Sequence, residues 1–282
     1  MKTVTVLTHG RPDELDVALA ALRIAAEKAG VTVQVSPEEI GEHGKGLAER
    51  LDLNDPLKDD VELCFAFGGD GTILRALRRY AGTNVPVFGV NFGEVGFLAT
   101  IEPSEVSHGF DAAFAGDFDV LSLPAISFRT EKNVFAAIND ISIHRRPGQR
   151  VAELAYVVDG VTVGSIRCDG LVAATPVGST GYNLANGGPL LAWGVEGFVV
   201  TFIAPHSLTA RPLVVAPGDT LEIVNRSRGE VDIAVDGRPA GETLHPGQSI
   251  FAHWVAEAGH LAQPQGSTFY ARVRERFGRL AV

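Results

Sequence analysis

The sequence predicts a doubly wound α/β domain at the N-terminal end and an all-β sandwich after it. Strand-like and helix-like segments alternate over the first third of the chain, which is typical of a parallel sheet covered by helices. Short β-type runs separated by turn residues then take over, and such a density of strands is typical of a sandwich. The chain has 282 residues, enough for one large domain or two ordinary ones.

The first domain is predicted from its pattern of apolar residues. We expect strands at residues 3–8, 31–35, 61–67 and 85–90, and helices at residues 15–29 and 72–80. Gly30 is well placed to end the first helix, because glycine readily adopts the left-handed conformation found there. Residues 41–57 have no firm period, so we expect a loop with a helix around residues 45–51.

The second domain is predicted from short runs between about residues 119 and 254. These runs include residues 134–143, 154–158, 161–166, 198–203, 220–224 and 231–235. Asp159-Gly160, between two of them, predicts a tight hairpin.

The end of the chain predicts one more helix. Phe269, Val273, Phe277 and Leu280 are spaced by four, four and three residues, which gives a helix one apolar stripe. We expect this stripe to pack on the rest of the protein, residues 1–101 to form the first domain and residues 102–262 to form the β-rich domain.

Composition limits the classes of function. The net charge of −10 argues against a protein that mainly binds nucleic acid, although a local site can still bind a phosphorylated small molecule. No apolar run approaches a membrane span and the N-terminus lacks the apolar core of a secretory signal, so we expect a cytoplasmic protein. Cys64 and Cys168 give neither a disulfide framework nor a zinc quartet.

The strongest local motif is Gly68-Gly69-Asp70-Gly71-Thr72, between a buried strand and the start of a helix. Its glycines allow the backbone to approach a ligand closely, and free N–H groups at a helix N-terminus favour phosphate. Asp70 would repel phosphate unless a metal ion bridges the two or Asp70 holds a substrate hydroxyl. The plainer interpretation is a structural turn with Asp70 as the cap. The segment is neither a Walker P-loop nor a GxGxxG motif.

Three other polar segments are candidates for a site. Residues 175–182 offer hydroxyls, glycines and a tyrosine ring that suit a nucleoside, though a polar turn has the same composition. Asn139-Asp140 follows an apolar run, where a turn or bulge is common. Arg167 and Asp169 end a strand, where alternation points both to one face, and a solvated pair is the alternative.

The remaining charged residues are less specific. Arg145, Arg146 and Arg150 form a loose basic cluster that suits a phosphate or a solvated loop equally well. His206 is a candidate general base, but a structural imidazole in a turn is the simpler interpretation. Asp236-Gly237 predicts a hairpin turn.

Taken together, these segments resemble the NAD kinase family. GGDGT alone is shared with diacylglycerol- and sphingosine-type lipid kinases and, in close form, with phosphofructokinases. The further matching segments are residues 91–98 (NFGEVGFL), Asn139-Asp140, residues 169–189 (from DGL through TPVGSTGY to NGGP) and residues 205–213 (PHSLTARPL). They fall in the family's order from about residue 66 to 237. Val177, Gly181 and Arg238 depart from its usual Thr, Ala and polar residue.

The resemblance implies a fold and a set of site residues. The first domain would be Rossmann-like or phosphofructokinase-like, and the β-rich domain would bind NAD. The tail, residues 263–282, would return to the first domain and complete it. Asp70 would be catalytic, and Gly68, Gly69, Gly71 and Thr72 would hold phosphates. The implied NAD contacts are Asp70, Gly71, Phe97, Asn139, Asp140, Arg167, Asp169, Thr180, Gly181, Tyr182, Asn183, Ala185 and Ala204.

The activity implied is phosphoryl transfer from ATP or polyphosphate to the adenosine-ribose 2′-hydroxyl of NAD, giving NADP. Mg²⁺ or another divalent cation would offset the phosphate charge, while Asp70 would orient the hydroxyl and accept its proton. The resemblance also implies a homodimer or homotetramer in which a neighbouring subunit completes the pocket. Two alternatives remain: a lipid or sphingoid kinase of the same superfamily, and a non-catalytic dinucleotide sensor.

Overall fold

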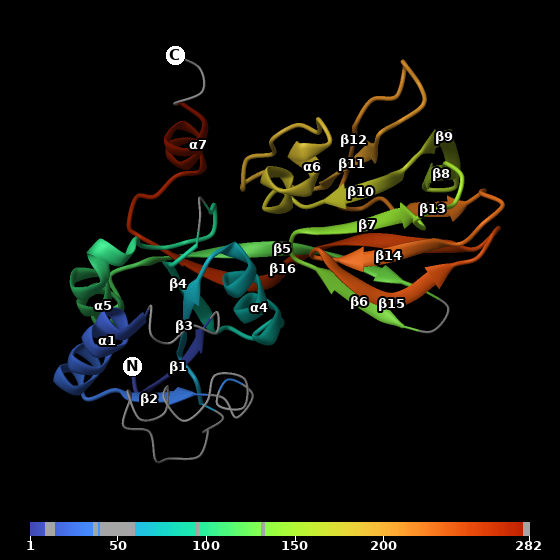
Figure 1. Cartoon of the computed structure of the whole chain (residues 1–282). Coiled ribbons are helices and arrows are strands. Elements are labelled where there is room, and N and C mark those ends of the chain that lie inside the picture. Colours follow the sequence, from blue (N-terminus) through green and yellow to red (C-terminus); the bar gives the residue numbers. More distant parts are fainter. Residues whose placement is uncertain (9–14, 36–38, 40–59, 94–95, 131–132, 279–282) are drawn as a thin grey trace. The chain divides into compact units, whose positions relative to one another are not determined.

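The computed structural model describes residues 1–8, 15–35, 39, 60–93, 96–130 and 133–278, which divide between two compact units. The first, here called the α/β unit, comprises Met1–Ser122 and Gly259–Val282. The second, the β unit, comprises Leu123–Ala258. Strands β5 (Asp119–Arg129) and β16 (Ser249–Gln263) run from one unit into the other (Figure 1).

The α/β unit is built on a parallel sheet. Its elements are β1 (Thr3–Thr8), α1 (Asp16–Ala29), β2 (Thr32–Val35), β3 (Leu63–Gly68), α4 (Asp70–Arg79), β4 (Pro86–Asn91), a 3₁₀ turn (Pro103–Glu105), α5 (Val106–Ala115) and α7 (Phe269–Phe277). The strand order is β2-β1-β3-β4, and the end of β16 pairs with β4. All these pairings are parallel. β1, β3 and β4 are buried at every residue, as their apolar runs predict.

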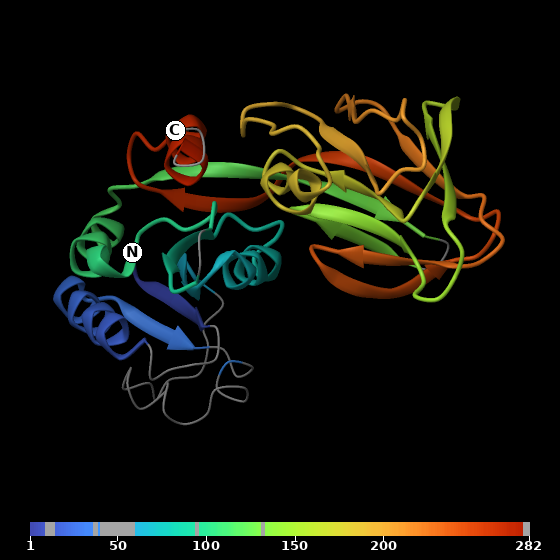
Figure 2. The ribbon, with the colours of Figure 1, turned by 45° about the horizontal axis from the view of Figure 1, so that its top comes forward.

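Helices cover both faces of this sheet. On one face the ring of Phe65 in β3 contacts Phe110 of α5 with centroids 5.3 Å apart, and α5 packs beside α1 (Figure 2). The next residue, Ala66, lies level with Gly89, where a Cβ would be 2.5 Å from the Ile73 side chain of α4. Because successive strand residues point to opposite faces, α4 lies opposite α1 and α5. The doubly wound prediction is confirmed.

The ends of the helices follow local sequence. α1 ends at Gly30 with φ of 68°, as predicted. α4 begins at Asp70, two residues before the predicted start, so the last three residues of GGDGT form its first turn. α7 is capped by the Thr268 side chain, which accepts the Ala271 N–H at 3.2 Å. Leu280 and the helix predicted around residues 45–51 lie outside the described residues.

The β unit is a sandwich of two antiparallel sheets. One sheet has the order β12-β11-β10-β7-β14-β15, and the other includes β13, β8, β9, the start of β16 and the β5–β6 hairpin. The bounds are β6 (Val134–Ala137), β7 (Asp140–Arg145), β8 (Ala152–Val158), β9 (Val161–Cys168), β10 (Gly170–Ala174), a 3₁₀ turn (Gly178–Thr180), α6 (Tyr182–Ala185), β11 (Phe198–Ile203), β12 (Leu213–Val215), β13 (Leu221–Asn225), β14 (Val231–Val235) and β15 (Arg238–Leu244). The sheets share one buried core, in which Tyr156 of β8 meets Phe202 of β11 with ring centroids 5.2 Å apart. The predicted sandwich is confirmed.

Two turns of the β unit bear on the sequence predictions. Asp159 and Gly160 have φ of 47° and 78° and join β8 to β9, which is the predicted hairpin. Residues 134–143, expected as one run, are instead two strands, β6 and β7, with a break at Ile138 and Asn139.

The units divide the chain at different points from those predicted. The first boundary lies after Ser122 rather than after residue 101, because Val106, Phe110 and Ala113 of α5 are buried in the core of the α/β unit. The second lies after Ala258 rather than after residue 262, because the end of β16 pairs with β4. Among the described helices, none has the length and apolar character needed to cross a membrane.

Candidate active site

The GGDGT segment forms the junction between β3 and α4. Gly68 ends the strand, Gly69 occupies the N-cap position and Asp70 is the first helical residue. The Thr72 N–H donates to the Gly69 carbonyl at 2.9 Å and closes the first turn. The earlier N–H groups have no partner within a helix, so the exposed end at Gly71 carries partial positive charge. This end of α4 is suited to an anion.

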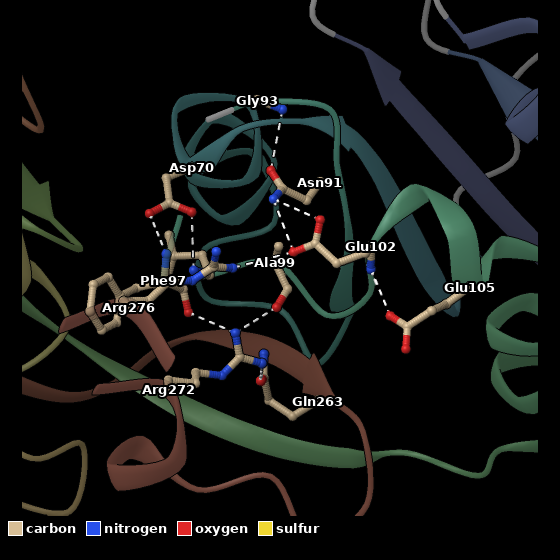
Figure 3. Close-up of polar contacts among 11 residues, drawn as sticks. Asp70, Asn91, Gly93, Phe97, Ala99, Glu102, Glu105, Gln263, Arg272 and Arg276 are labelled. Atoms are coloured by element: carbon tan, nitrogen blue, oxygen red, sulfur yellow. Dashed lines mark hydrogen bonds and ion pairs between the residues drawn. The ribbon is translucent and has the colours of Figure 1, made fainter. Parts of the chain in front are cut away.

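The Asp70 carboxylate fixes the loop that follows β4. Its Oδ2 accepts the Phe97 N–H at 2.8 Å and its Oδ1 accepts the Leu98 N–H at 3.0 Å (Figure 3). The N-cap of α4 is Gly69, so the plainer interpretation of Asp70 as the helix cap is wrong. Each carboxylate oxygen retains a further lone pair, so Asp70 can hold this loop and still accept a hydrogen bond from a ligand.

Glycine is required at two positions near Asp70, because a Cβ there would collide with neighbouring atoms. A Cβ at Gly96 would lie 2.3 Å from Asp70 Oδ1, and a Cβ at Gly93 would lie 2.7 Å from the Gly69 Cα. The Phe92 N–H donates to the Gly68 carbonyl at 3.1 Å. The GGDGT and NFGEVGFL motifs, read separately in the sequence, are thus two sides of one packed structure. Glu94 and Val95 of the second motif lie outside the described residues.

Helix α7 holds this loop from the other side. The Arg272 guanidinium donates to the Phe97 carbonyl at 3.0 Å, to the Ala99 carbonyl at 2.7 Å and to the Gln263 side chain (Figure 3). The Phe97 ring packs on Phe277 with centroids 5.4 Å apart. Burial and then the neighbouring Arg276 lower the pKa of Arg272 from its ordinary value. The tail therefore packs on the α/β unit as predicted, and it does so on the loop that Asp70 contacts.

A second set of contacts ties the base of the loop to α7. The Asn91 amide donates to both carboxylate oxygens of Glu102 at 3.1 Å, and Asn91 Oδ1 accepts the Gly93 N–H at 3.2 Å (Figure 3). Arg276 forms an ion pair with Glu102 at 3.3 Å. The Glu105 carboxylate accepts the Glu102 N–H at 2.9 Å. The loop from Asn91 to Glu102 is thus fixed at both ends.

A divalent cation fits this region together with phosphate ligands. In the described part of the chain, no group of three His, Cys, Asp or Glu side chains is arranged to hold a metal ion. Asp70 offers one carboxylate at the N-terminus of α4. Mg²⁺ commonly takes one or two carboxylates, water and substrate phosphates as ligands, so the residues present suit a cation that arrives with the phosphates.

In the β unit, Asn139 and Asp140 are held by Asp236. Asp236 accepts the Asn139 N–H at 2.7 Å and the Asp140 N–H at 3.3 Å, and its own N–H donates to the Asp140 carbonyl at 2.8 Å. Asp236 and Gly237 have φ of 46° and 73°, so the predicted hairpin turn is also a clamp on this segment. Asn139 Oδ1 is buried without a hydrogen-bond partner among the described residues, which a bound donor would satisfy.

The Asp140 side chain has an unusual titration. Burial raises its pKa to about 7, and the neighbouring Asp236 carboxylate adds to the rise. Only 5% of Asp140 is exposed. Near neutral pH the side chain is therefore part acid and part carboxylate, and the carboxylate form can accept hydrogen bonds from sugar hydroxyls.

The hydroxyls of residues 175–182 mostly face inward. Thr175 and Ser179 are fully buried and donate to the carbonyls of Ile138 and Pro176, both at 2.6 Å. Thr180 donates to the Val177 carbonyl at 3.0 Å. The expectation that Thr175 and Ser179 offer hydroxyls to a nucleoside is wrong, because these groups fix the loop against the sheet.

Asn183 also serves the loop. It is fully buried, its amide donates to the Ser179 carbonyl at 3.0 Å and the Pro189 carbonyl at 2.9 Å, and its oxygen accepts from Thr201 at 2.6 Å. Its side chain is hydrogen-bonded inside the protein, and its role as an NAD contact stays a prediction. Gly181, Tyr182 and Ala185 of the same segment are exposed.

A pair of glycine substitutions tests how this loop is held. A Cβ at Gly178 would lie 2.0 Å from the Asn139 carbonyl oxygen, whereas a Cβ at Gly181 would lie at an ordinary 3.5 Å from the Gly178 carbonyl oxygen. Gly178→Ala should lower the free energy of unfolding by about 1–3 kcal/mol. Gly181→Ala should change it by less than about 1 kcal/mol. Thermal unfolding of both proteins checks this, and equal stabilities would contradict the close approach at Gly178.

The other candidate residues lie at the far end of β10. Asp169 pairs with Arg145 at 2.5 Å, and this hydrogen bond lowers the pKa of Asp169. The Asp169 N–H donates to the Ile203 carbonyl at 2.9 Å and the His206 N–H donates to the Arg167 carbonyl at 2.7 Å. The structure thus brings the Arg167–Asp169 segment to the turn after β11. His206 is exposed in that turn, and its backbone forms the structural contact.

Ala204 and Tyr182 complete this surface. Ala204 is exposed in the turn after β11 with φ of 44°, a conformation in which a non-glycine residue is uncommon. The Tyr182 ring lies 5.7 Å from His144, which is level with Gly170 in the sheet. The Asn139–Asp140 segment is level with the opposite end of β10, about 14 Å away at the rise of an antiparallel strand. The candidates of the β unit therefore form two groups near the two ends of β10, and the Tyr182 ring lies by His144, at the same end as Asp169.

Several residues of this architecture were missed in the sequence. Arg272, Gln263 and Glu102 support the loop that Asp70 contacts, but the only sequence signal was the Arg-rich, amphipathic tail. Asp236 was identified as a turn residue and not as a clamp. Arg146, one of the loose basic cluster, forms ion pairs with Glu230 and Asp232.

Two family models match the chain. The ATP-NAD kinase N-terminal domain matches residues 15–118, and the ATP-NAD kinase C-terminal domain matches residues 138–256. The first match contains GGDGT and the loop fixed by Asp70. The second contains Asn139–Asp140, the loop of residues 175–191 and Asp236. The two matches therefore include both groups of candidate residues.

Curated relatives and solved structures agree with these models. The chain is 36% identical over 238 residues to an NAD kinase of Gemmatimonas aurantiaca, covering 82% of this chain and 80% of that one. It is 32% identical to an NAD kinase of Lachnoclostridium phytofermentans, covering 99% of each chain. The yeast NADH kinase complexed with NADH shares the fold with a TM-score of 0.83 at 24% identity, over 99% of this chain and 88% of that chain. An Archaeoglobus fulgidus NAD kinase in complex with ATP gives 0.74 at 25% identity, over 100% and 99%.

Proposed function

Because the chain belongs to the NAD kinase family, we propose that it transfers the terminal phosphoryl group of ATP to the adenosine-ribose 2′-hydroxyl of NAD, giving NADP. The observation that carries the assignment of the chemistry is the position of Asp70. Its carboxylate sits at the exposed N-terminus of α4, where an anion is favoured, and it is fixed by two backbone N–H groups.

In the mechanism that we propose, the N-terminus of α4 holds the donor phosphates through its free N–H groups. Gly68, Gly69, Gly71 and Thr72 form this phosphate loop. A divalent cation such as Mg²⁺, bound through phosphate oxygens and Asp70, would offset the negative charge that builds up during transfer. Transfer is direct and in line, so the residues act by positioning and charge rather than through a covalent intermediate.

Asp70 is assigned as the residue that orients and deprotonates the acceptor hydroxyl. A carboxylate at a helix N-terminus is a weak base, because the helix dipole favours its ionised form. A weak base is sufficient when the proton leaves late, as in a loose phosphoryl-transfer transition state. The bonds from Phe97 and Leu98 hold the carboxylate in one orientation, so its remaining lone pairs face a fixed direction.

We assign the binding of the dinucleotide to the β unit. Asp140 in its carboxylate form and Asn139 suit ribose hydroxyls. The other proposed contacts lie in the segment that follows β10: Thr180, Gly181, Tyr182 and Ala185. At the other end of β10, Arg167, Asp169 and Ala204 suit the second nucleoside half. The separation of about 14 Å between the groups supports an extended dinucleotide. Asn183 is assigned a positional role, and Phe97 and Gly71 remain proposed contacts from the α/β unit.

Arg272 is proposed as the residue that positions the Asp70 loop. Arg272→Met removes the hydrogen bonds to Phe97 and Ala99, so we expect kcat to fall about tenfold while KM for NAD stays within about twofold. Arg274→Met, which removes an exposed arginine of the same helix, is the control and should leave both constants unchanged. Steady-state kinetics well below the unfolding temperature measure this. A lower unfolding temperature with unchanged kcat would reduce Arg272 to a purely structural role.

The molecule that accepts the phosphoryl group distinguishes the proposed function from its alternatives. Purified protein with ATP and Mg²⁺ is incubated with NAD or with diacylglycerol, and transfer of labelled phosphate is measured. Product from NAD alone is the expected result, and product from diacylglycerol would support the lipid kinase. Tight NAD binding without turnover would support a dinucleotide sensor. Polyphosphate as a second donor and a homodimeric or homotetrameric assembly remain predictions, tested by replacing ATP in this assay and by sedimentation.

A further inference from the structure

The β unit contains a basic pocket outside the residues assigned above, apart from Arg167 on its wall. The pocket has a volume of about 380 Å³. It is lined by the loop after β7, the start of β8 and the loop between β13 and β14. Its arginines are Arg145, Arg150, Arg167, Arg226 and Arg228. This concentration of positive charge stands out on a chain whose net charge is −10.

Most of these arginines have no acidic partner. Arg145 is paired with Asp169, but Arg150, Arg167, Arg226 and Arg228 are exposed and form no ion pair with any described residue. The pocket has two acidic residues, Glu153 and Glu230, against five arginines, and only Glu230 is paired with basic residues outside the pocket. Glu153 accepts a hydrogen bond from Ser165 at 3.1 Å, and Glu230 pairs with Arg146 and, at 2.8 Å, with His245. The pocket therefore keeps a surplus of unpaired guanidinium groups.

The chemistry of the wall indicates the kind of anion. Guanidinium groups present planar forks of N–H donors, which match phosphate oxygens in pairs. The remaining wall residues include Val151, Ala152 and Val231 but no aromatic side chain, so the pocket lacks the aromatic rings on which bases most commonly stack. Several separate guanidiniums suit several linked phosphates better than one. The lining thus favours an inorganic phosphate chain over a nucleotide or nucleic acid.

We propose that this pocket is an oligophosphate-binding site, held chiefly by Arg150, Arg226 and Arg228. It lies wholly within the β unit and is built from other residues than the GGDGT loop. The proposal does not depend on kinase activity, since a folded but inactive Asp70→Asn protein should bind the same ligand. NADP formation distinguishes two roles for the bound phosphate chain. A donor supports NADP formation when tripolyphosphate replaces ATP, and an effector changes the rate when tripolyphosphate is added to ATP.

The test is a calorimetric titration of the full chain with sodium tripolyphosphate. Arg226→Ala and Arg228→Ala should each weaken binding by about tenfold, because each removes one charge-assisted contact. Arg129→Ala is the matched control, since Arg129 is an exposed arginine of the β unit outside the pocket. It should bind within about twofold of the unaltered protein. Any tripolyphosphate that binds at the GGDGT loop binds equally in all these proteins. Differences in affinity between the variants therefore come from the pocket alone.

Two results would overturn the site. Equal affinity in Arg228→Ala, Arg226→Ala and Arg129→Ala would mean that tripolyphosphate is attracted only by general surface charge. Displacement of the pocket-dependent binding by saturating NAD would make these arginines part of the dinucleotide site, which Arg167 adjoins. Because all of the substituted residues are exposed, thermal unfolding should be unchanged and loss of binding cannot come from loss of the fold.

Discussion

Replacing Asp70 with asparagine should lower kcat for NADP formation by about 10²- to 10⁴-fold, the range over which a positioned proton acceptor acts. The amide cannot take the proton of the 2′-hydroxyl, and it removes the negative charge through which a cation would be held. NAD bound by the β unit should be little affected, so the dissociation constant for NAD should stay within about threefold. Steady-state kinetics and calorimetric NAD titration of the same preparation measure the two effects.

The Asp70 loop supplies the control for this prediction. Asparagine replaces one of the two accepting oxygens with an NH2 donor, which would face the N–H of Phe97 or Leu98, so part of any loss could come from a displaced loop. Arg272→Met releases the same loop while keeping the carboxylate. If Asp70 acts in the chemistry, Asp70→Asn loses at least about tenfold more than Arg272→Met. Equal losses would mean that Asp70 only holds the loop.

Replacing Asp140 with asparagine should stabilise the protein and weaken NAD binding. The pKa of Asp140 is raised from 3.8 to about 7, so the folded state binds more protons than the unfolded state between these values. Stability is therefore lost as pH rises from about 4 to about 7 and stays low above that. At pH 8 the asparagine variant should be more stable by about 2 kcal/mol, and NAD should bind about tenfold more weakly because a charge-assisted contact is gone.

The pH dependence of both properties checks the assignment of Asp140. In the unaltered protein KM for NAD should fall as pH rises through about 7, where the carboxylate forms, and this dependence should be absent in Asp140→Asn. Glu257→Gln, at an exposed position of β16, is the control and should leave the pH profiles unchanged. An Asp140→Asn protein that is less stable than the parent at pH 8 would contradict the raised pKa.

The sequence was most informative where one local rule decides the structure. The run from Thr3 to Thr8 is a strand with those bounds, and Gly30 ends its helix because the left-handed conformation is needed there. Other bounds moved because of contacts distant in sequence. The run from Val134 to Ile143 is broken at Asn139 because Asp236, far along the chain, binds the backbone at that point.

In the candidate site, too, local features could be predicted and contacts between distant residues could not. The GGDGT motif predicted Asp70 and a phosphate loop, and the segment does join a buried strand to the start of a helix, as its sequence indicated. Its support by Arg272 could not be predicted, since nothing local links a tail arginine to the carbonyls of Phe97 and Ala99. Side-chain direction was equally hidden: the hydroxyls of Thr175 and Ser179 looked available in the sequence but face the protein interior.

We predict that this chain phosphorylates NAD and that Asp70 performs the step that requires a carboxylate. The direct measurement is NADP formation from NAD, ATP and Mg²⁺, followed with an NADP-specific dehydrogenase, for the unaltered protein and for Asp70→Asn that retains NAD binding. Steady turnover by the first and its near-complete loss in the second is the predicted result. Turnover by Asp70→Asn close to that of the unaltered protein, or no NADP from either, would contradict it.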